Sequence, residues 1–194
     1  MRLSWHKPIA PDSLPQKQMF TSLIPCMFLV SASSANVLNL SNGAIKKFVD
    51  LHNQYRKETG AGLPDLTWSQ EMACYAAKLA SKCKFAHDPA KKYGENIYMS
   101  SQKLTDVKAA MDSSASWRSE KSRVAADNWD CAYDLSEATT CGHYSQQVWK
   151  ATKEIGCGVS VCDSGTMVFC EYKPAGNVRR YDPATGKTVN TPPY

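Results

Sequence analysis

The cysteines constrain the fold of this 194-residue chain more than any other feature of its sequence. Cys26 lies in an apolar segment near the start, and the other seven fall in the body of the chain: Cys74, Cys83, Cys131, Cys141, Cys157, Cys162 and Cys170. They lack the paired Cys-x-x-Cys spacing with histidines that zinc fingers use, so a disulfide framework is the expected state in an exported chain. Because the seven cysteines in the body of the chain are an odd number, one of them is left without a partner in that framework.

The first 35 residues are typical of a leader that ends in a signal peptide. The apolar run from Met19 to Ala35 has signal-peptide length, and Ser33 and Ala35 suit the positions before a cleavage site. The run is too short to span a bilayer. Residues 1–18 are polar and proline-rich, which favours translation from Met19. We therefore expect residues 1–35 to be removed and the mature protein to be secreted and extracellular, with no membrane span.

The charge of the mature chain excludes nucleic acid as an expected partner. Removing Arg2, Lys7, Lys17 and Asp12 with the leader leaves 20 basic and 17 acidic residues of the 23 and 18 in the whole chain. The basic residues are scattered and are not interleaved with aromatic residues in the way that a nucleic-acid groove requires. They are interpreted as solvated surface charge.

The periodicity of apolar residues predicts an α+β domain. Helical spacing covers four segments, 45–60, 69–83, 105–120 and 143–151. Short β-prone runs cover 94–98, 155–161 and 166–172, and the last two read as an antiparallel hairpin. Residues 178–194 contain prolines and glycine without periodicity and are expected to form an extended C-terminal tail.

Two histidines and two glutamates stand in four local motifs in the middle of the chain. The motifs are Phe85-Ala86-His87-Asp88, Gly94-Glu95-Asn96-Ile97, Trp117-Arg118-Ser119-Glu120 and Cys141-Gly142-His143-Tyr144-Ser145-Gln146. Two longer stretches accompany them, Gly142 to Thr152 and Val168 to Asn177. On these motifs the chain, from about Lys46 to Asn177, resembles the CAP superfamily, which comprises cysteine-rich secretory, antigen-five and plant pathogenesis-related class-one proteins. It is most similar in style to the plant type.

The resemblance implies a fold, a domain range and a pairing of cysteines. The family fold is a disulfide-stabilised three-layer α-β-α sandwich, which we assign to residues 36–177. The implied bridges are Cys83–Cys162, Cys131–Cys141 and Cys157–Cys170. Cys74 has no counterpart in that set, and we expect a buried free thiol there rather than an intermolecular bridge. Glu171 departs from the family pattern, which usually has Asn or another non-acidic polar residue at that position.

The resemblance also implies that His87, Glu95, Glu120 and His143 converge in one cleft. Three interpretations of this tetrad remain open. It can be a hydrogen-bond network that fixes the cleft; it can bind zinc or another divalent metal through His87 and His143; or it can be the site of a metal-dependent hydrolase or protease with Glu95 or Glu120 as general base. No cofactor besides the metal is expected.

The family further implies carriage of a small lipid, either a sterol or a fatty acid. Trp129 and Tyr133, in the segment closed by the implied Cys131–Cys141 bridge, are the candidate lipid loop, with packing of these rings on their own disulfide as the alternative. We interpret the chain as a secreted, non-enzymatic effector or defence protein. Another interpretation is a precursor of a C-terminal signalling peptide released near Cys170-Glu171-Tyr172. Nothing in the sequence identifies a protein receptor.

Overall fold

The computed structural model describes residue 26 and residues 36–125, 128–134, 136 and 138–194. The expected signal peptide lies outside these residues apart from Cys26. The helices are α1 (Asn42–Lys57), α2 (Gln70–Ala80), α3 (Asp106–Ser119) and α4 (Gly142–Gln147), with 3-10 helices η1 (Glu120–Arg123) and η2 (Asp130–Tyr133) between the last two. The strands are β1 (Asn36–Val37), β2 (Thr67–Trp68), β3 (Gly94–Ser100), β4 (Glu154–Cys162), β5 (Gly165–Lys173), β6 (Arg179–Asp182) and β7 (Lys187–Asn190).

The central sheet is built on the β4–β5 hairpin that the sequence predicts. Its order is β1-β4-β5-β3 with antiparallel neighbours, and the two-residue β2 pairs with β4 in parallel. In the β3–β5 register, Glu95 lies opposite Glu171 and Asn96 opposite Cys170. This register brings the second motif alongside the stretch near the C-terminus.

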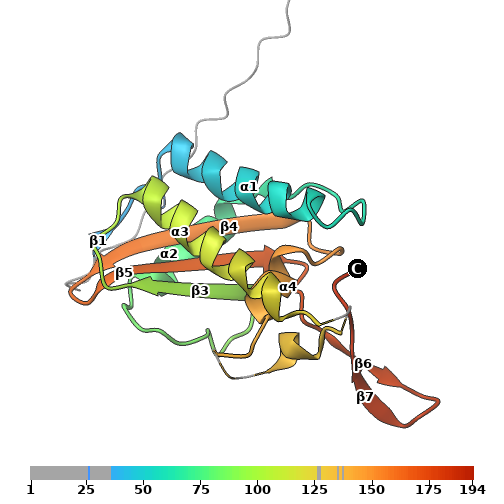
Figure 1. Ribbon diagram of the computed structural model, residues 1–194. Helices are drawn as coiled ribbons and strands as arrows, with labels where there is room; N and C mark the ends of the chain where they lie inside the picture. The colour runs from blue at the N-terminus through green and yellow to red at the C-terminus, as the bar shows by residue number, and fades with distance from the viewer. Residues whose placement is uncertain (1–25, 27–35, 126–127, 135, 137) are drawn as a thin grey trace, which may run out of the picture.

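Helices cover both faces of the sheet and form three layers (Figure 1). Alternate residues of β5 point to opposite sides, since side chains along a strand alternate. Tyr172 packs with Phe48 of α1 and Trp117 of α3 in one buried cluster. Phe169 packs with Leu79 and other residues of α2 in a second cluster. The α-β-α sandwich is therefore confirmed.

Helix α2 lies directly on the backbone of β4. A Cβ atom added to Gly156 would come within 2.4 Å of Ala73 N, and one added to Gly158 within 2.1 Å of Ala77 N. Such contacts are too short for any side chain, so the two glycines and the small residues of α2 allow a close approach of helix and strand. This contact fixes where α2 presents its side chains at the edge of the site.

A buried arginine determines the backbone that follows α4. The Arg56 side chain is 0% exposed, and its guanidinium donates to the carbonyl oxygens of Pro64 (2.7 Å), Gln147 (3.2 Å), Trp149 (2.9 Å) and Thr152 (3.3 Å). The expected helix to residue 151 ends at Gln147 instead. We attribute the early end to these carbonyls, which the guanidinium binds in place of a further helical turn.

All three disulfides implied by the resemblance are present, Cys83–Cys162, Cys131–Cys141 and Cys157–Cys170. The expectation for Cys74 is wrong. Cys74 is only partly buried on α2, and it is joined to Cys26 with a Cα–Cα distance of 5.4 Å, which is within the range that a disulfide spans. The sequence argument assigned Cys26 to the removed leader and so left Cys74 without a partner.

The C-terminal segment is more ordered than the expected extended tail. Strands β6 and β7 pair as an antiparallel hairpin that projects from the sandwich (Figure 1). The Tyr133 hydroxyl lies at the base of the hairpin, 2.8 Å from the carbonyl oxygens of Val178 and Thr191. Beyond it, Lys150 N donates to Pro193 O (2.8 Å) and the Tyr194 ring packs edge-on against Trp129. These contacts supply the order that the residue pattern did not reveal.

Within the described ranges, no helix combines the length and the apolar character needed to cross a bilayer.

Candidate functional site

The first half of the site is the pair of Glu120 and His143. The two residues come from the junction of α3 with η1 and from the first turn of α4. Glu120 Oε1 lies 2.7 Å from His143 Nδ1, and Glu120 Oε2 accepts hydrogen bonds from the backbone N–H groups of His143 (3.0 Å) and Tyr144 (3.2 Å). The Glu120 carboxylate thus has two roles at the start of α4. It binds backbone N–H groups that have no partner within the helix, and it orients the His143 imidazole.

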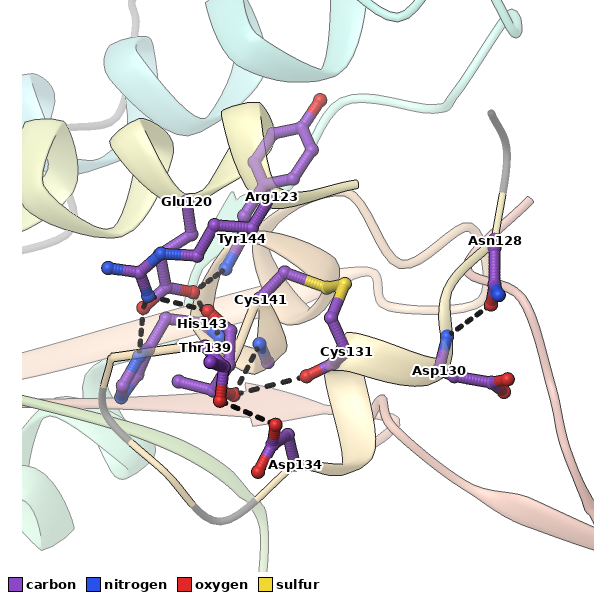
Figure 2. The surroundings of a disulfide bond; sticks show 12 residues. Glu120, Arg123, Asn128, Asp130, Cys131, Asp134, Thr139, Cys141, His143 and Tyr144 are labelled. Atoms are coloured by element: carbon purple, nitrogen blue, oxygen red, sulfur yellow. Dashed lines mark hydrogen bonds and ion pairs between the residues drawn. A yellow bond between two sulfur atoms is a disulfide. The ribbon is translucent and has the colours of Figure 1, made fainter. Parts of the chain in front are cut away.

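The surroundings of this pair hold it rigidly. Figure 2 shows the Glu120 carboxylate between Arg123 and His143, beside the Cys131–Cys141 bridge. Arg123 Nη1 is 3.7 Å from Glu120 Oε1 and donates to Thr140 O at 2.6 Å. The Trp117 ring stacks on the His143 ring at a centroid distance of 6.2 Å. The imidazole, with 13% of its side chain exposed, is therefore fixed on several sides.

The second half is the pair of His87 and Glu95. The side chain of Glu95, on β3, is 7% exposed, whereas the His87 side chain is 66% exposed. Glu95 Oε1 lies 2.6 Å from His87 Nδ1 and accepts from Asp88 N at 3.1 Å. The sequence motifs thus appear as two His–Glu pairs of the same design, one enclosed and one facing solvent.

Asn96, which follows Glu95 on β3, connects the two pairs. Its amide donates to the carbonyl oxygen of His143 (3.0 Å) and to the hydroxyl of Tyr172 (3.2 Å). Tyr172 Oη is in turn 2.9 Å from His52 Nε2. The sequence identified Asn96 only as part of a motif, and its bridging role depends on the β3–β5 register.

His52, on α1, is a core residue. It is 0% exposed, its Nδ1 lies 2.8 Å from Phe48 O, and burial lowers its pKa to about 4. It is therefore neutral at physiological pH and is held by hydrogen bonds at both ring nitrogens.

The two imidazoles share one feature, a carboxylate at Nδ1. In each, a carboxylate accepts from Nδ1, which selects the tautomer whose Nε2 can bind a cation. Among the described residues, no three His, Cys, Asp or Glu side chains gather around one point. The described residues therefore do not offer the four protein ligands that a structural zinc site needs.

The two residues of the candidate lipid loop are packed against the domain. Trp129 is 8% exposed, and its ring stacks on Tyr144 at 6.0 Å and meets Tyr194 at 5.5 Å. Tyr133 uses its hydroxyl at the base of the hairpin. In this conformation the rings contribute to a local core with Leu63, Cys141 and Val148.

Comparisons with known proteins agree with this architecture. Residues 49–172 match the Cysteine-rich secretory protein (CAP) family. The chain is 34% identical to Pathogenesis-related protein 1C of Nicotiana tabacum over 158 residues, which cover 78% of this chain and 85% of that protein. It is 30% identical to Peptidase inhibitor 16 of Homo sapiens, covering 81% of this chain but only 35% of that protein. The chain thus spans about a third of the length of the human relative.

Solved structures give the same result. The crystal structure of NaASP2 with Zn2+ superposes with a TM-score of 0.62 at 31% identity, covering 72% of this chain and 83% of that one. The family match extends over more than half of the chain and includes both His–Glu pairs. The chain therefore belongs to the CAP family of cysteine-rich secretory proteins.

Proposed function

We propose that this chain is an exported effector or defence protein that acts by binding rather than by catalysis, and that His87 and His143 bind a divalent cation such as zinc. The observation that supports the cation is the carboxylate at each Nδ1, 2.6 Å from His87 and 2.7 Å from His143. Such carboxylates orient metal-binding imidazoles. The related NaASP2 was crystallised with Zn2+, which supports testing that ion first.

Isothermal titration of zinc into the purified protein tests this proposal. We expect His87→Ala and His143→Ala each to abolish saturable binding, because each removes one of only two protein donors. Glu120→Gln should weaken binding by about 10- to 100-fold, because it disturbs the orientation of His143. Glu71→Gln is the matched control, since Glu71 is exposed and its carboxylate accepts hydrogen bonds from the surface residues Lys92 and Tyr93. Equal affinity in wild type and both alanine variants would rule out this site.

A metal-dependent hydrolase is the rival function, and the hydrogen bonds argue against it. Glu120 accepts three hydrogen bonds and Glu95 Oε1 accepts two. A carboxylate that already binds an imidazole and backbone N–H groups is a poor general base, because those donors occupy the oxygens that would have to accept a proton. Turnover of an ester or peptide pool that disappears in Glu95→Gln and Glu120→Gln would instead favour the enzyme.

The lipid is the second part of the proposal, and family membership is its main support. A sterol or fatty acid at the loop around Trp129 has to replace the contacts that this ring makes with Tyr144 and Tyr194. We expect labelled cholesterol or palmitate to bind the wild type at least about tenfold more tightly than Trp129→Ala, since the indole supplies a large apolar surface. His143→Ala should bind the lipid as the wild type does. A chelator should leave lipid binding unchanged, and the reverse pattern would place the lipid at the His–Glu pairs.

A further inference from the structure

Two glutamates face each other at the inner end of the site. Glu95 on β3 and Glu171 on β5 are directly opposite in the antiparallel register, so their side chains project from the same face of the sheet. Glu171 is 1% exposed and the Glu95 side chain 7%. Two ionised carboxylates in such a position would repel each other strongly with little water to screen them.

The hydrogen bonds differ sharply between the oxygens of these carboxyl groups. Glu95 Oε1 accepts from His87 Nδ1 and Asp88 N. Glu95 Oε2 and Glu171 Oε1 are both buried, and neither has a hydrogen-bond donor among the described residues. Buried acceptors without donors are rare and costly. One proton between the two groups would satisfy both oxygens, because a protonated carboxyl is a donor.

The donors at Glu95 determine which carboxyl group holds the proton. Glu95 already accepts hydrogen bonds from His87 Nδ1 and Asp88 N–H, so it acts as the acceptor and Glu171 is left as the donor. The groups that face Glu171 are Glu95 on β3, Asp88 in the loop before β3 and the Tyr75 phenol on α2, while Gly156 is opposite it on β4. Burial, followed by the charge and hydrogen bond of Glu95, raises the pKa of Glu171 to about 9.

We propose that Glu171 is a neutral carboxylic acid that donates its proton to Glu95 Oε2, and that it is a positioning residue for the His87–Glu95 pair. The pair is thereby extended to a hydrogen-bonded series of three side chains. The series runs from the exposed imidazole of His87 through Glu95 to the buried Glu171. A neutral Glu171 also explains how this chain accommodates an acid where the family pattern has a non-acidic polar residue. This role does not depend on whether the imidazoles bind a cation.

The pH dependence of stability tests the proposal through Glu171→Gln. The native state holds this proton from the ordinary glutamate pKa of 4.5 up to about 9, whereas the unfolded chain releases it near 4.5. The contribution of Glu171 is therefore fully present below pH 4.5 and is lost as the pH rises to about 9. The variant lacks this titration. The ratio of the variant's folding constant to that of the wild type should therefore increase by up to about tenfold for each pH unit from 4.5 to about 9.

Urea unfolding of the wild type and variants from pH 4 to pH 9.5 gives these folding constants. Glu154→Gln is the control, because Glu154 is partly exposed on β4, and its profile should run parallel to wild type. Glu171→Gln should also retain the His87–Glu95 geometry, since an amide N–H can replace the acid as donor, whereas Glu171→Leu should lose it; histidine NMR shifts report this difference. Parallel profiles for Glu171→Gln and wild type would overturn the proposal.

Infrared spectroscopy of the wild type provides a test that needs no variant. A protonated carboxyl shows a carbonyl band distinct from that of a carboxylate. We expect such a band at neutral pH in protein labelled with 13C-glutamate, and its loss as the pH passes about 9. The absence of a protonated glutamate at neutral pH would contradict the proposal, even if Glu171→Gln failed to fold. Zinc titration plays no part in either measurement, so the outcome is separate from that of the proposed cation site.

Discussion

Replacing Arg56 with methionine should lower the free energy of unfolding by about 4 kcal/mol or more, because it removes the donors of four carbonyl oxygens. The guanidinium is fully buried and connects α1 to the segments around Pro64, Gln147, Trp149 and Thr152. A buried acceptor that loses its donor costs about 1–3 kcal/mol, and methionine returns only part of this through apolar packing. Urea unfolding monitored by tryptophan fluorescence measures the change.

Two further variants sharpen this prediction. Arg56→Lys should not restore stability, because a single ammonium group cannot reach carbonyls that are bound through Nε, Nη1 and Nη2. Lys57→Met is the matched control: Lys57 is the next residue, exposed, with a surface ion pair to Asp65 at 3.3 Å, and its loss should cost less than about 1 kcal/mol. If Arg56→Met is as stable as Lys57→Met, the carbonyl bonds contribute no net stability.

Removing the Cys83–Cys162 bridge in a double alanine variant should lower the free energy of unfolding by about 4 kcal/mol. The bridge joins residues 79 positions apart, and closing a long loop removes more conformational entropy from the unfolded chain than closing a short one. It also ties the segment after α2, which leads to His87, to the end of β4. Thermal or urea unfolding in the absence of reductant measures the loss.

The Cys131–Cys141 bridge provides the internal comparison for this prediction. It spans only 10 positions, so its removal in the same way should cost about 3 kcal/mol, clearly less than the longer bridge. A larger loss for the short bridge would mean that packing of the loop on Glu120 and His143, rather than chain entropy, dominates its contribution.

Much of the fold could be predicted because its determinants are local in the sequence. The apolar spacing that predicts α1 and α2 arises because each helix covers one face of the sheet. A short turn between two β-prone runs predicts the β4–β5 hairpin. The candidate site residues also came from short motifs. The orientation of His87 and His143 could not be predicted from these motifs, because their carboxylate partners are 8 and 23 positions away.

What the sequence could not reveal depends on contacts between distant segments. Arg56 looks like any basic residue near the end of an amphipathic helix, and three of its acceptors lie more than 90 positions away. Glu171 was visible only as a departure from a pattern, since its relation to Glu95 follows from strand register. The order of residues 178–194 depends on the Tyr133 hydroxyl, which no local periodicity encodes.

The attachment of the β6–β7 hairpin at its base has a consequence for any processing of the C-terminal region. A protease that cut the exposed hairpin tip would leave both arms tethered to the same phenol, since Tyr133 contacts Val178 on one arm and Thr191 on the other. The distal fragment would retain its Pro193 contact with Lys150 and the edge-on packing of Tyr194 against Trp129. Cleavage alone would therefore yield a nicked but assembled molecule, and liberation of a diffusible peptide would require a second event that detaches these anchors.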